Sequence, residues 1–147
     1  MPAARLLVAS FAVLALAGCG QPANWVTGTS LDLPNLVATQ FASTPEHFVL
    51  GQEVTVHITV QNRGRVAAGP FDVEYAVTPH GGYYPWPRDH VAGLAPGESA
   101  VVDFVNEVSS PEDVPIQVTV DPDNQVRESS ETDNITRYTV HVESAGG

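Results

Sequence analysis

The chain has 147 residues, enough for one domain of ordinary size, and it carries 17 acidic residues against six basic ones. Its formal net charge of −11 argues against a nucleic-acid partner, because nucleic acid binds basic surfaces. It also argues against attachment to anionic lipid head groups, so any link to a membrane has to come from another feature of the chain.

The N-terminal segment has the features of an export signal. Arg5 is followed by the apolar run Leu6 to Leu16, which is too short to cross a bilayer as a helix. The run ends in Leu16-Ala17-Gly18-Cys19, which resembles the lipobox of bacterial lipoproteins. The resemblance implies that residues 1–18 are removed and that Cys19 carries lipid, which places the domain in the cell envelope outside the cytoplasm, on an outer membrane or a cell membrane. The alternative is an ordinary secretory signal with a chance cysteine.

Cys19 is the only cysteine, so the exported domain is expected to fold without disulfides. Residues 19–33 are rich in small and polar side chains and lack periodicity, which predicts a flexible tether spanning about 20 Å. Trp25 within it could lie at the membrane interface or fold back on the domain. The folded domain is expected over residues 34–143, and residues 144–147 are expected to be a disordered tail.

Between these ends the chain repeats short runs in which apolar and polar residues alternate, broken by Gly and Pro, as is typical of β-strands. The predicted strands are Leu36 to Phe41, Val54 to Val60, Phe71 to Val77, Ala100 to Phe104, Ile116 to Val120 and Tyr138 to Val142. Alternation predicts that Ala76 faces outward with Asp72 and Glu74. We expect Gly64 to turn the backbone with a positive φ, and Leu94 to Glu98 to form a tight turn.

Strands at this spacing favour an all-β fold, an immunoglobulin- or fibronectin-III-like two-sheet sandwich of about seven strands. Helix should be scarce, because no segment after the signal keeps helical periodicity for three turns.

The acidic connection Asp121 to Asn134 lies between the last two predicted strands. Its first four residues, Asp-Pro-Asp-Asn, have the chemistry of a type I turn. Val126 is its only sizeable apolar residue and is expected to point inward.

Three segments together resemble the CARDB family, the cell-adhesion-related domains of bacterial and archaeal surface proteins. They are GQEVTVHITVQNRGRVAAGPFDVEYAV, GLAPGES, and the acidic connection with VRESSETDN. The resemblance covers roughly Asp32 to Val142. It implies an immunoglobulin-like sandwich that serves as an extracellular adhesion or spacer module without catalytic machinery. The segment His80 to His90, HGGYYPWPRDH, departs from the family because it is longer and more aromatic.

The acidic connection could bind calcium, because hard cations take carboxylate oxygens. The candidate ligands are Asp121, Asp123, Glu128, Glu131 and Asp133. The EF-hand pattern is not met, since Val126 occupies the glycine position and Thr132 the glutamate position. The alternative is structural: Asp121, Asn124, Ser129 and Asn134 would bond local backbone amides and hold the loop in shape.

The aromatic segment offers a second candidate site. Tyr83, Tyr84 and Trp86 could form a platform for a sugar ring or a hot spot for a protein, with Arg88 adding a hydrogen-bonding fork. The alternative is that these rings close one end of the sandwich.

Catalysis finds no support in the sequence. His57 and His141 are expected to point outward from opposite sheets, and His80 and His90 flank the aromatic segment without a third metal ligand. Ser99 does not lie in a G-x-S-x-G elbow, and H-E-x-x-H is absent. The expected function is therefore a non-catalytic, lipid-anchored binding or adhesion module that contacts a protein or carbohydrate partner and needs no cofactor other than possible calcium. The alternative is a structural subunit of an envelope complex that pairs through an edge strand.

Overall fold

The computed structural model describes residues 32–144, a β-sandwich with one short 3-10 turn, η1 (Pro79–Gly81). The predicted signal peptide, Cys19, Trp25 and the C-terminal residues 145–147 lie outside the described residues. Within residues 32–144 no helix is long and apolar enough to span a bilayer.

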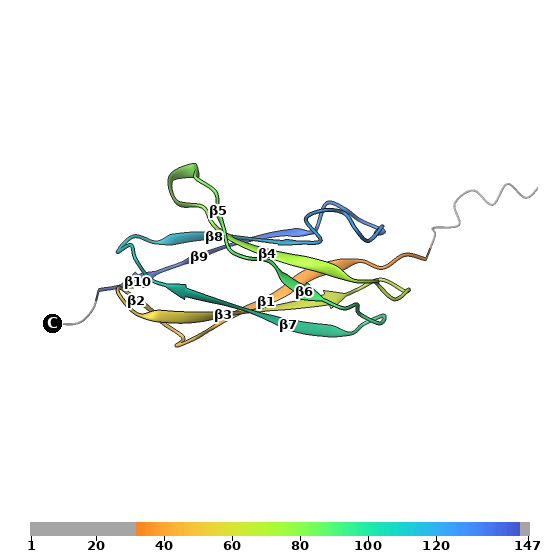
Figure 1. Ribbon diagram of the computed structural model, residues 1–147, viewed down its shortest axis with the longest axis horizontal. Helices are drawn as coiled ribbons and strands as arrows, with labels where there is room; N and C mark the ends of the chain where they lie inside the picture. The colour runs from red at the N-terminus through yellow and green to blue at the C-terminus, as the bar shows by residue number, and fades with distance from the viewer. Residues whose placement is uncertain (1–31, 145–147) are drawn as a thin grey trace, which may run out of the picture.

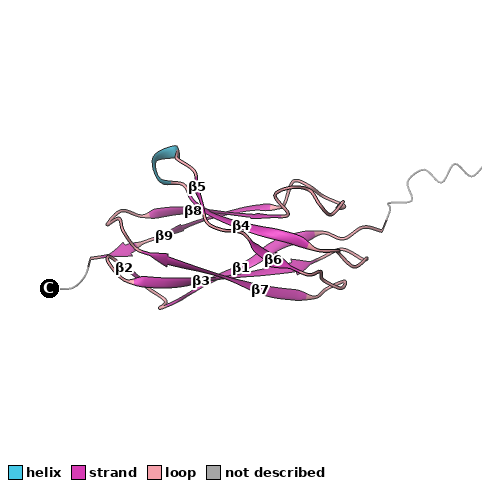
Figure 2. Cartoon of the chain, in the orientation of Figure 1, coloured by secondary structure: helices cyan, strands magenta, loops and turns pink. Residues whose placement is uncertain are grey.

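The strands lie in two layers, which are seen edge-on in Figure 1 and coloured by type in Figure 2. One sheet has the order β1-β3-β7, with β1 (Leu36–Thr44), β3 (Glu53–Asn62) and β7 (Ser99–Glu107). The other has the order β5-β4-β8-β9, with β4 (Phe71–Val77), β5 (Tyr84–Pro85), β8 (Val114–Val120) and β9 (Ile135–Val140), and β6 (Asp89–Val91) also pairs with β4. A separate parallel pair joins β2 (Phe48–Val49) to β10 (Val142–Glu143). The predicted two-sheet sandwich is confirmed.

The structure has ten strands where about seven are predicted from the alternation. All six strands of six or more residues coincide with predicted ones, whereas the four missed strands have only two or three residues, too few to show a period. β5 and β6 both pair with β4, as two halves of one edge strand that is interrupted at residues 86–88. Counting them as one strand, and setting the β2–β10 pair aside, gives the predicted number.

The core is formed by the inward rows of the long strands, and the alternation in β3 is regular, with Val54, Val56, Ile58 and Val60 at most 1% exposed. Ala76 is an exception, because it is fully buried rather than facing outward into solvent. It lies in register between Pro85 of β5 and Gln117 of β8, and these neighbours cover its small side chain.

The prediction that Gly64 supplies a positive φ is wrong. In the described chain, glycines with positive φ occur at Gly51, Gly81, Gly93 and Gly97. Gly64 is needed for a different reason, since a Cβ there would collide with the backbone of Leu33 and Pro34. The incoming chain therefore lies directly against the β3–β4 connection.

Asn62, next to this glycine, is fully buried and its side chain makes four hydrogen bonds. Its Oδ1 accepts from the backbone N–H of Asn35 (3.1 Å) and of Gly64 (2.9 Å). Its Nδ2 donates to the carbonyls of Val66 (2.8 Å) and Leu94 (3.0 Å). One side chain thus joins the incoming chain to two connections at this end of the sandwich, which we call the entry end.

Candidate functional site

Trp86 occupies the break between β5 and β6 and turns inward. Its backbone N–H donates to Tyr75 O (2.8 Å), and its ring packs edge-on against the ring of Tyr75, with centroids 5.6 Å apart. Its Nε1–H donates to the carbonyl of Val105 on β7, in the opposite sheet (3.1 Å). Trp86 therefore links the two sheets at their open edge, which supports the structural interpretation for this ring.

Tyr83 and Tyr84 remain on the surface, 47% and 58% exposed. The Tyr83 hydroxyl donates to Glu74 on the outer face of β4, and partial burial together with that carboxylate raises the pKa of Tyr83. The four residues predicted to contact a partner thus do not form one platform, because Trp86 points between the sheets while Tyr83 lies over one of them.

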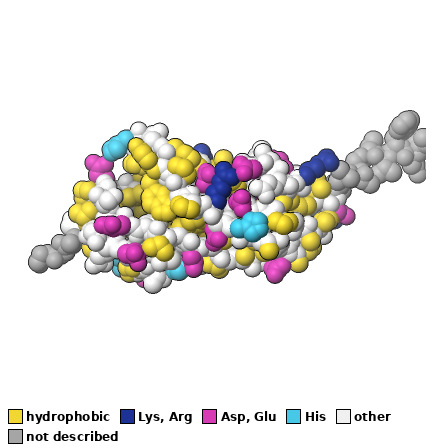
Figure 3. Space-filling model, in the orientation of Figure 1, with side chains coloured by type: hydrophobic (Ala, Val, Ile, Leu, Met, Phe, Trp, Pro, Cys, Tyr) yellow, Lys and Arg dark blue, Asp and Glu magenta, His cyan; other side chains and the backbone are white. Residues whose placement is uncertain are grey.

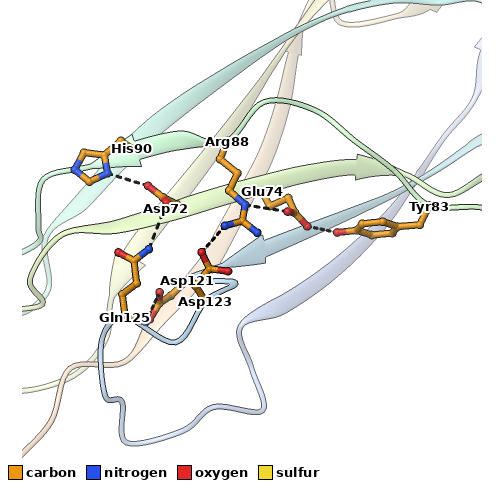
Figure 4. Close-up of polar contacts among 8 residues, drawn as sticks. All are labelled: Asp72, Glu74, Tyr83, Arg88, His90, Asp121, Asp123 and Gln125. Atoms are coloured by element: carbon orange, nitrogen blue, oxygen red, sulfur yellow. Dashed lines mark hydrogen bonds and ion pairs between the residues drawn. The ribbon is translucent and has the colours of Figure 1, made fainter.

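Arg88 pairs with two carboxylates (Figure 4). Its Nε lies 3.0 Å from Glu74 Oε2, and its Nη1 lies 2.6 Å from Asp123 Oδ2. Asp123 belongs to the acidic connection Asp121 to Asn134, which we call the acidic loop. Beside this pair, His90 Nδ1 lies 2.8 Å from Asp72 Oδ1, a hydrogen bond that lowers the pKa of Asp72. These contacts fasten the acidic loop to β4, so the Arg88 fork is occupied within the chain.

The acidic loop folds around Asp121, which is 2% exposed and has a φ of 49°. Its two carboxylate oxygens accept from the backbone N–H groups of Gln125 (2.9 Å) and Val126 (2.8 Å). The predicted turn closes with a bond from Asn124 N to Asp121 O (3.1 Å), and Val126 is buried as expected. Asp121 therefore shapes the loop.

The second half of the loop clamps the incoming chain. Glu128 is 6% exposed and accepts from Leu36 N and from Asn134 Nδ2 (3.0 Å), and its burial raises its pKa to about 7. Asp133 accepts from Asn35 Nδ2 (3.0 Å). The expectation that the side chains of Ser129 and Asn134 bond local backbone amides is wrong: Ser129 Oγ donates to Asn35 Oδ1 (3.3 Å), and Asn134 Nδ2 donates to the side chains of Glu128 and Glu131. Side chains of the loop reach across the fold because the incoming chain runs beside it.

These contacts engage all five predicted calcium ligands. Each accepts a hydrogen bond or ion pair from the chain itself, Glu131 through the backbone N–H of Glu128 (2.9 Å). Over residues 32–144 no group of three or more Asp, Glu, His or Cys side chains is arranged to hold a metal ion. The residues as arranged do not fit a calcium site.

The histidines are likewise engaged singly, each beside one carboxylate. The pairs are His47 with Glu143 (3.1 Å), His57 with Asp103 (2.6 Å), His80 with Glu112 (3.0 Å), His90 with Asp72 (2.8 Å) and His141 with Asp113 (2.9 Å). His80 and His90 do not approach each other as partners, because η1 turns His80 toward the β7–β8 connection.

A pocket of about 120 Å³ lies at the end of the sandwich away from Asp32, between the β4–β5 hairpin and the β7–β8 connection. Its walls are mainly apolar and include Phe48, Tyr75, Val77, Trp86, Val108 and Val114. Sequence reasoning missed this pocket, since its walls come from segments that lie far apart in the chain. We call this region the pocket end.

Asn106 forms part of the pocket wall and is 8% exposed. Its Nδ2 donates to Phe104 O (3.1 Å), but its buried Oδ1 accepts no hydrogen bond from residues 32–144. Asn134 Oδ1 in the acidic loop shares this property, although that side chain donates two bonds. An unsatisfied buried oxygen is unusual and calls for an explanation. At Asn106 the unsatisfied oxygen belongs to a residue of the pocket wall.

The comparison with family models decides the classification, since the CARDB model matches residues 33–137. The chain belongs to the CARDB family. This confirms the resemblance drawn from the sequence motifs. The CARDB family is cell-adhesion-related, and membership in it suggests that the domain is a non-catalytic module. No curated protein sequence matches the chain.

Solved CARDB structures share the fold. A CARDB domain from Pyrococcus furiosus, described as a complex with di-metal ions, is 22% identical with a TM-score of 0.64, over 78% of this chain and 97% of that one. A domain from a Methanosarcina acetivorans protein, described as a cell surface protein, is 25% identical with a TM-score of 0.62, over 76% and 93%. A β-glucosidase from Erythrobacter marinus is 17% identical with a TM-score of 0.54, over 75% of this chain but only 16% of the enzyme. The CARDB fold here is therefore similar to one part of that enzyme, and this likeness carries no catalytic inference.

Proposed function

We propose that this CARDB domain is a lipid-anchored binding module of the cell envelope, and that it contacts a protein or glycan partner through the pocket end. The observation that carries the proposal is the pocket itself, whose wall holds a buried amide oxygen without a donor. Binding sites in proteins are typically concave and apolar, with a few polar groups that fix the ligand.

The position of the pocket supports the anchoring part of the proposal. Asp32 lies beside Arg65 of the β3–β4 connection (3.9 Å) at the entry end, so a tether from Cys19 would join the domain at the end away from the pocket. Figure 1 shows the described chain beginning at this end. The lipidated cysteine would then hold the entry end toward the membrane and present the pocket to the surroundings. We expect the wild-type protein in the membrane fraction with incorporated palmitate, and a Cys19→Ser variant without label. A labelled Cys19→Ser variant would contradict the anchor.

Blocking the pocket tests the binding part. Ser109 is exposed and lines the pocket, so Ser109→Trp would fill the pocket at little expense to folding. Ser99, exposed at the opposite end of β7, gives the matched control Ser99→Trp. We expect Ser109→Trp to reduce binding of the purified protein to isolated cell envelopes at least tenfold, with Ser99→Trp unchanged. Equal binding of both variants to the envelopes would show that the pocket does not contact the partner.

A second candidate is pairing through an edge strand in an envelope complex. β9 is the outer strand of the larger sheet, and its Ile135 is 46% exposed. An open edge strand can accept a strand from another chain. If Ile135→Lys abolishes envelope binding while Ser109→Trp does not, this alternative replaces the pocket.

Metal binding is not part of the proposal. The di-metal ions of the Pyrococcus furiosus domain raise the question for this chain. The acidic side chains of residues 32–144 do not support it, because no three of them are arranged to hold a metal ion.

A further inference from the structure

We infer that the pocket end recognises an alkylammonium group, and that its occupant is a lysine side chain of a partner protein. The inference rests on the proposed use of this pocket and adds the chemical class of the group that enters it. It is carried by the size of the pocket, the chemistry of its walls and the charge around its mouth.

The size of the pocket favours a single side chain. Its volume is about 120 Å³. A cavity of roughly 150 Å³ lined by apolar side chains holds a benzene molecule, whereas sites for free small ligands span roughly 300–1,000 Å³. A four-carbon chain with a terminal nitrogen is close in size to benzene and suits a cavity of this volume. The rest of the contact area with a partner protein has to come from the surface around the pocket. Tyr84 offers such surface, since it is 58% exposed and pairs in register with Val77 of the pocket wall.

The walls match an alkyl chain that ends in a cation. The rings of Tyr75 and Trp86 lie edge-on to each other, and aromatic rings attract cations as well as apolar chains. The Oδ1 of Asn106 accepts no hydrogen bond from residues 32–144, and a turn of this amide toward the pocket would let it accept one from an ammonium group, which has donors and no acceptor. A carboxylate or phosphate has no donor for the Asn106 oxygen, and its negative charge would be repelled by that oxygen.

The charge around the mouth has one sign. Glu107, Glu112 and Asp113 line the pocket. Glu112 lies beside His80 and Asp113 beside His141, whereas Glu107 makes no side-chain hydrogen bond or ion pair within residues 32–144. None of the arginines of the described chain lines the pocket, and the sequence contains no lysine. Figure 3 shows acidic side chains near this end, while the arginines of that face lie toward the middle and the entry end. The same end therefore attracts a cation and disfavours an anion.

A titration observed by NMR tests the inference. The reporter is the indole N–H of Trp86, in a Trp25→Phe background that leaves one tryptophan. The probes are acetyl-Gly-Lys-Gly-amide, the same peptide with norleucine in place of lysine, and butylamine. We expect the lysine peptide to shift the Trp86 signal saturably with a Kd on the order of 1 mM, the norleucine peptide to bind at least tenfold more weakly, and butylamine to bind more weakly than the lysine peptide.

Equal binding of lysine and norleucine peptides, or no shift with either, overturns the inference. Butylamine that binds as tightly as the peptide would make a free amine, not a partner's lysine, the occupant.

Charge variants give the second arm. Glu107→Gln with Asp113→Asn should weaken the lysine peptide about fivefold, because the two carboxylates at the mouth are lost. The matched control is Asp32→Asn with Asp103→Asn, which makes the same charge change at exposed carboxylates away from the pocket. Equal weakening in both variants would mean that net charge, not the pocket, attracts the peptide. If Ser109→Trp abolishes envelope binding while the lysine peptide fails to bind, the proposed function stands and the ammonium inference fails.

Discussion

Two buried asparagines, Asn62 at the entry end and Asn106 at the pocket end, differ in how their side chains are hydrogen-bonded. At the entry end, Asn62 is fully buried and its amide makes four hydrogen bonds to three segments. At the pocket end, Asn106 makes one hydrogen bond, and its buried oxygen accepts none from the described chain. A fully satisfied buried network stabilises and fixes a fold, whereas a buried oxygen without a donor costs stability. The side chain of Asn62 therefore stabilises the fold, whereas the oxygen of Asn106, like that of Asn134 in the acidic loop, forms no bond within residues 32–144.

The same substitution at both asparagines tests this contrast most directly. Asn62→Leu should lower the free energy of unfolding by about 3 kcal/mol, because it leaves the N–H of Asn35 and Gly64 and two carbonyls without their partner. Urea denaturation at neutral pH measures the loss. A loss below about 1 kcal/mol would mean that the entry end does not depend on Asn62.

Glu128, also at the entry end, should give the protein an unusual pH dependence. Its pKa is raised by burial from 4.5 to about 7, so between these values the folded state binds more protons than the unfolded state. Stability from this group is therefore present at low pH and is lost as pH rises toward 7. We expect about 3 kcal/mol of such loss between pH 4.5 and 8.

Glu128→Gln isolates this effect, because the variant keeps an acceptor for Leu36 N and cannot ionise. At pH 8 it should be more stable than the wild type, and near pH 4.5 the two should be equal. The histidines and other carboxyls titrate in both proteins and cancel in the difference. A wild type that is more stable than Glu128→Gln at pH 8 would show that the ionised carboxylate is favourable where it lies.

The aromatic segment separates into a structural ring and a surface ring. Trp86→Ala removes the packing against Tyr75 and the bond to Val105, and should lower stability by about 2 kcal/mol. Tyr84→Ala should change stability by less than about 0.5 kcal/mol, because the side chain is mostly exposed. Thermal melts of both variants check this, and equal losses would place both rings in the structure.

Asn106→Leu at the pocket end should raise stability by about 1 kcal/mol, since it removes an unsatisfied oxygen from an apolar wall. It should also abolish the Trp86 response to the lysine peptide. A variant that gains stability and loses binding identifies a position retained for function. A destabilised Asn106→Leu would make the two asparagines equivalent and end the contrast.

Calcium should have the smallest effect. Because the five predicted ligands already accept bonds from the chain, millimolar calcium should move the melting temperature by less than about 1 °C relative to chelator. A site with a Kd of about 10 μM would instead add close to 3 kcal/mol. A shift of several degrees would show that the loop rearranges to bind the ion.

The fold could be predicted from the sequence because the strands that form the core of a sandwich show a local alternation of apolar and polar residues, as in Val54 to Val60. The pocket could not, because Trp86, Asn106 and Phe48 come together only when the sheets pack. The clamp of Glu128 on Leu36 joins residues 92 positions apart, and no local pattern marks that contact. Asn62 and Asn106 both end an inward row of their strand, so sequence alone does not show that one is satisfied and the other is not.

The indole of Trp86 also bears on solubility. β7 is an outer strand of its sheet, and its exposed face carries Val101 and Val105, 60% and 53% exposed. Such an edge invites intermolecular aggregation. By bonding the Val105 carbonyl, Trp86 removes an acceptor from the middle of that edge and leaves β7 a poor template for another copy of the chain. The break between β5 and β6 therefore lowers the tendency of this edge to pair with another copy of the chain.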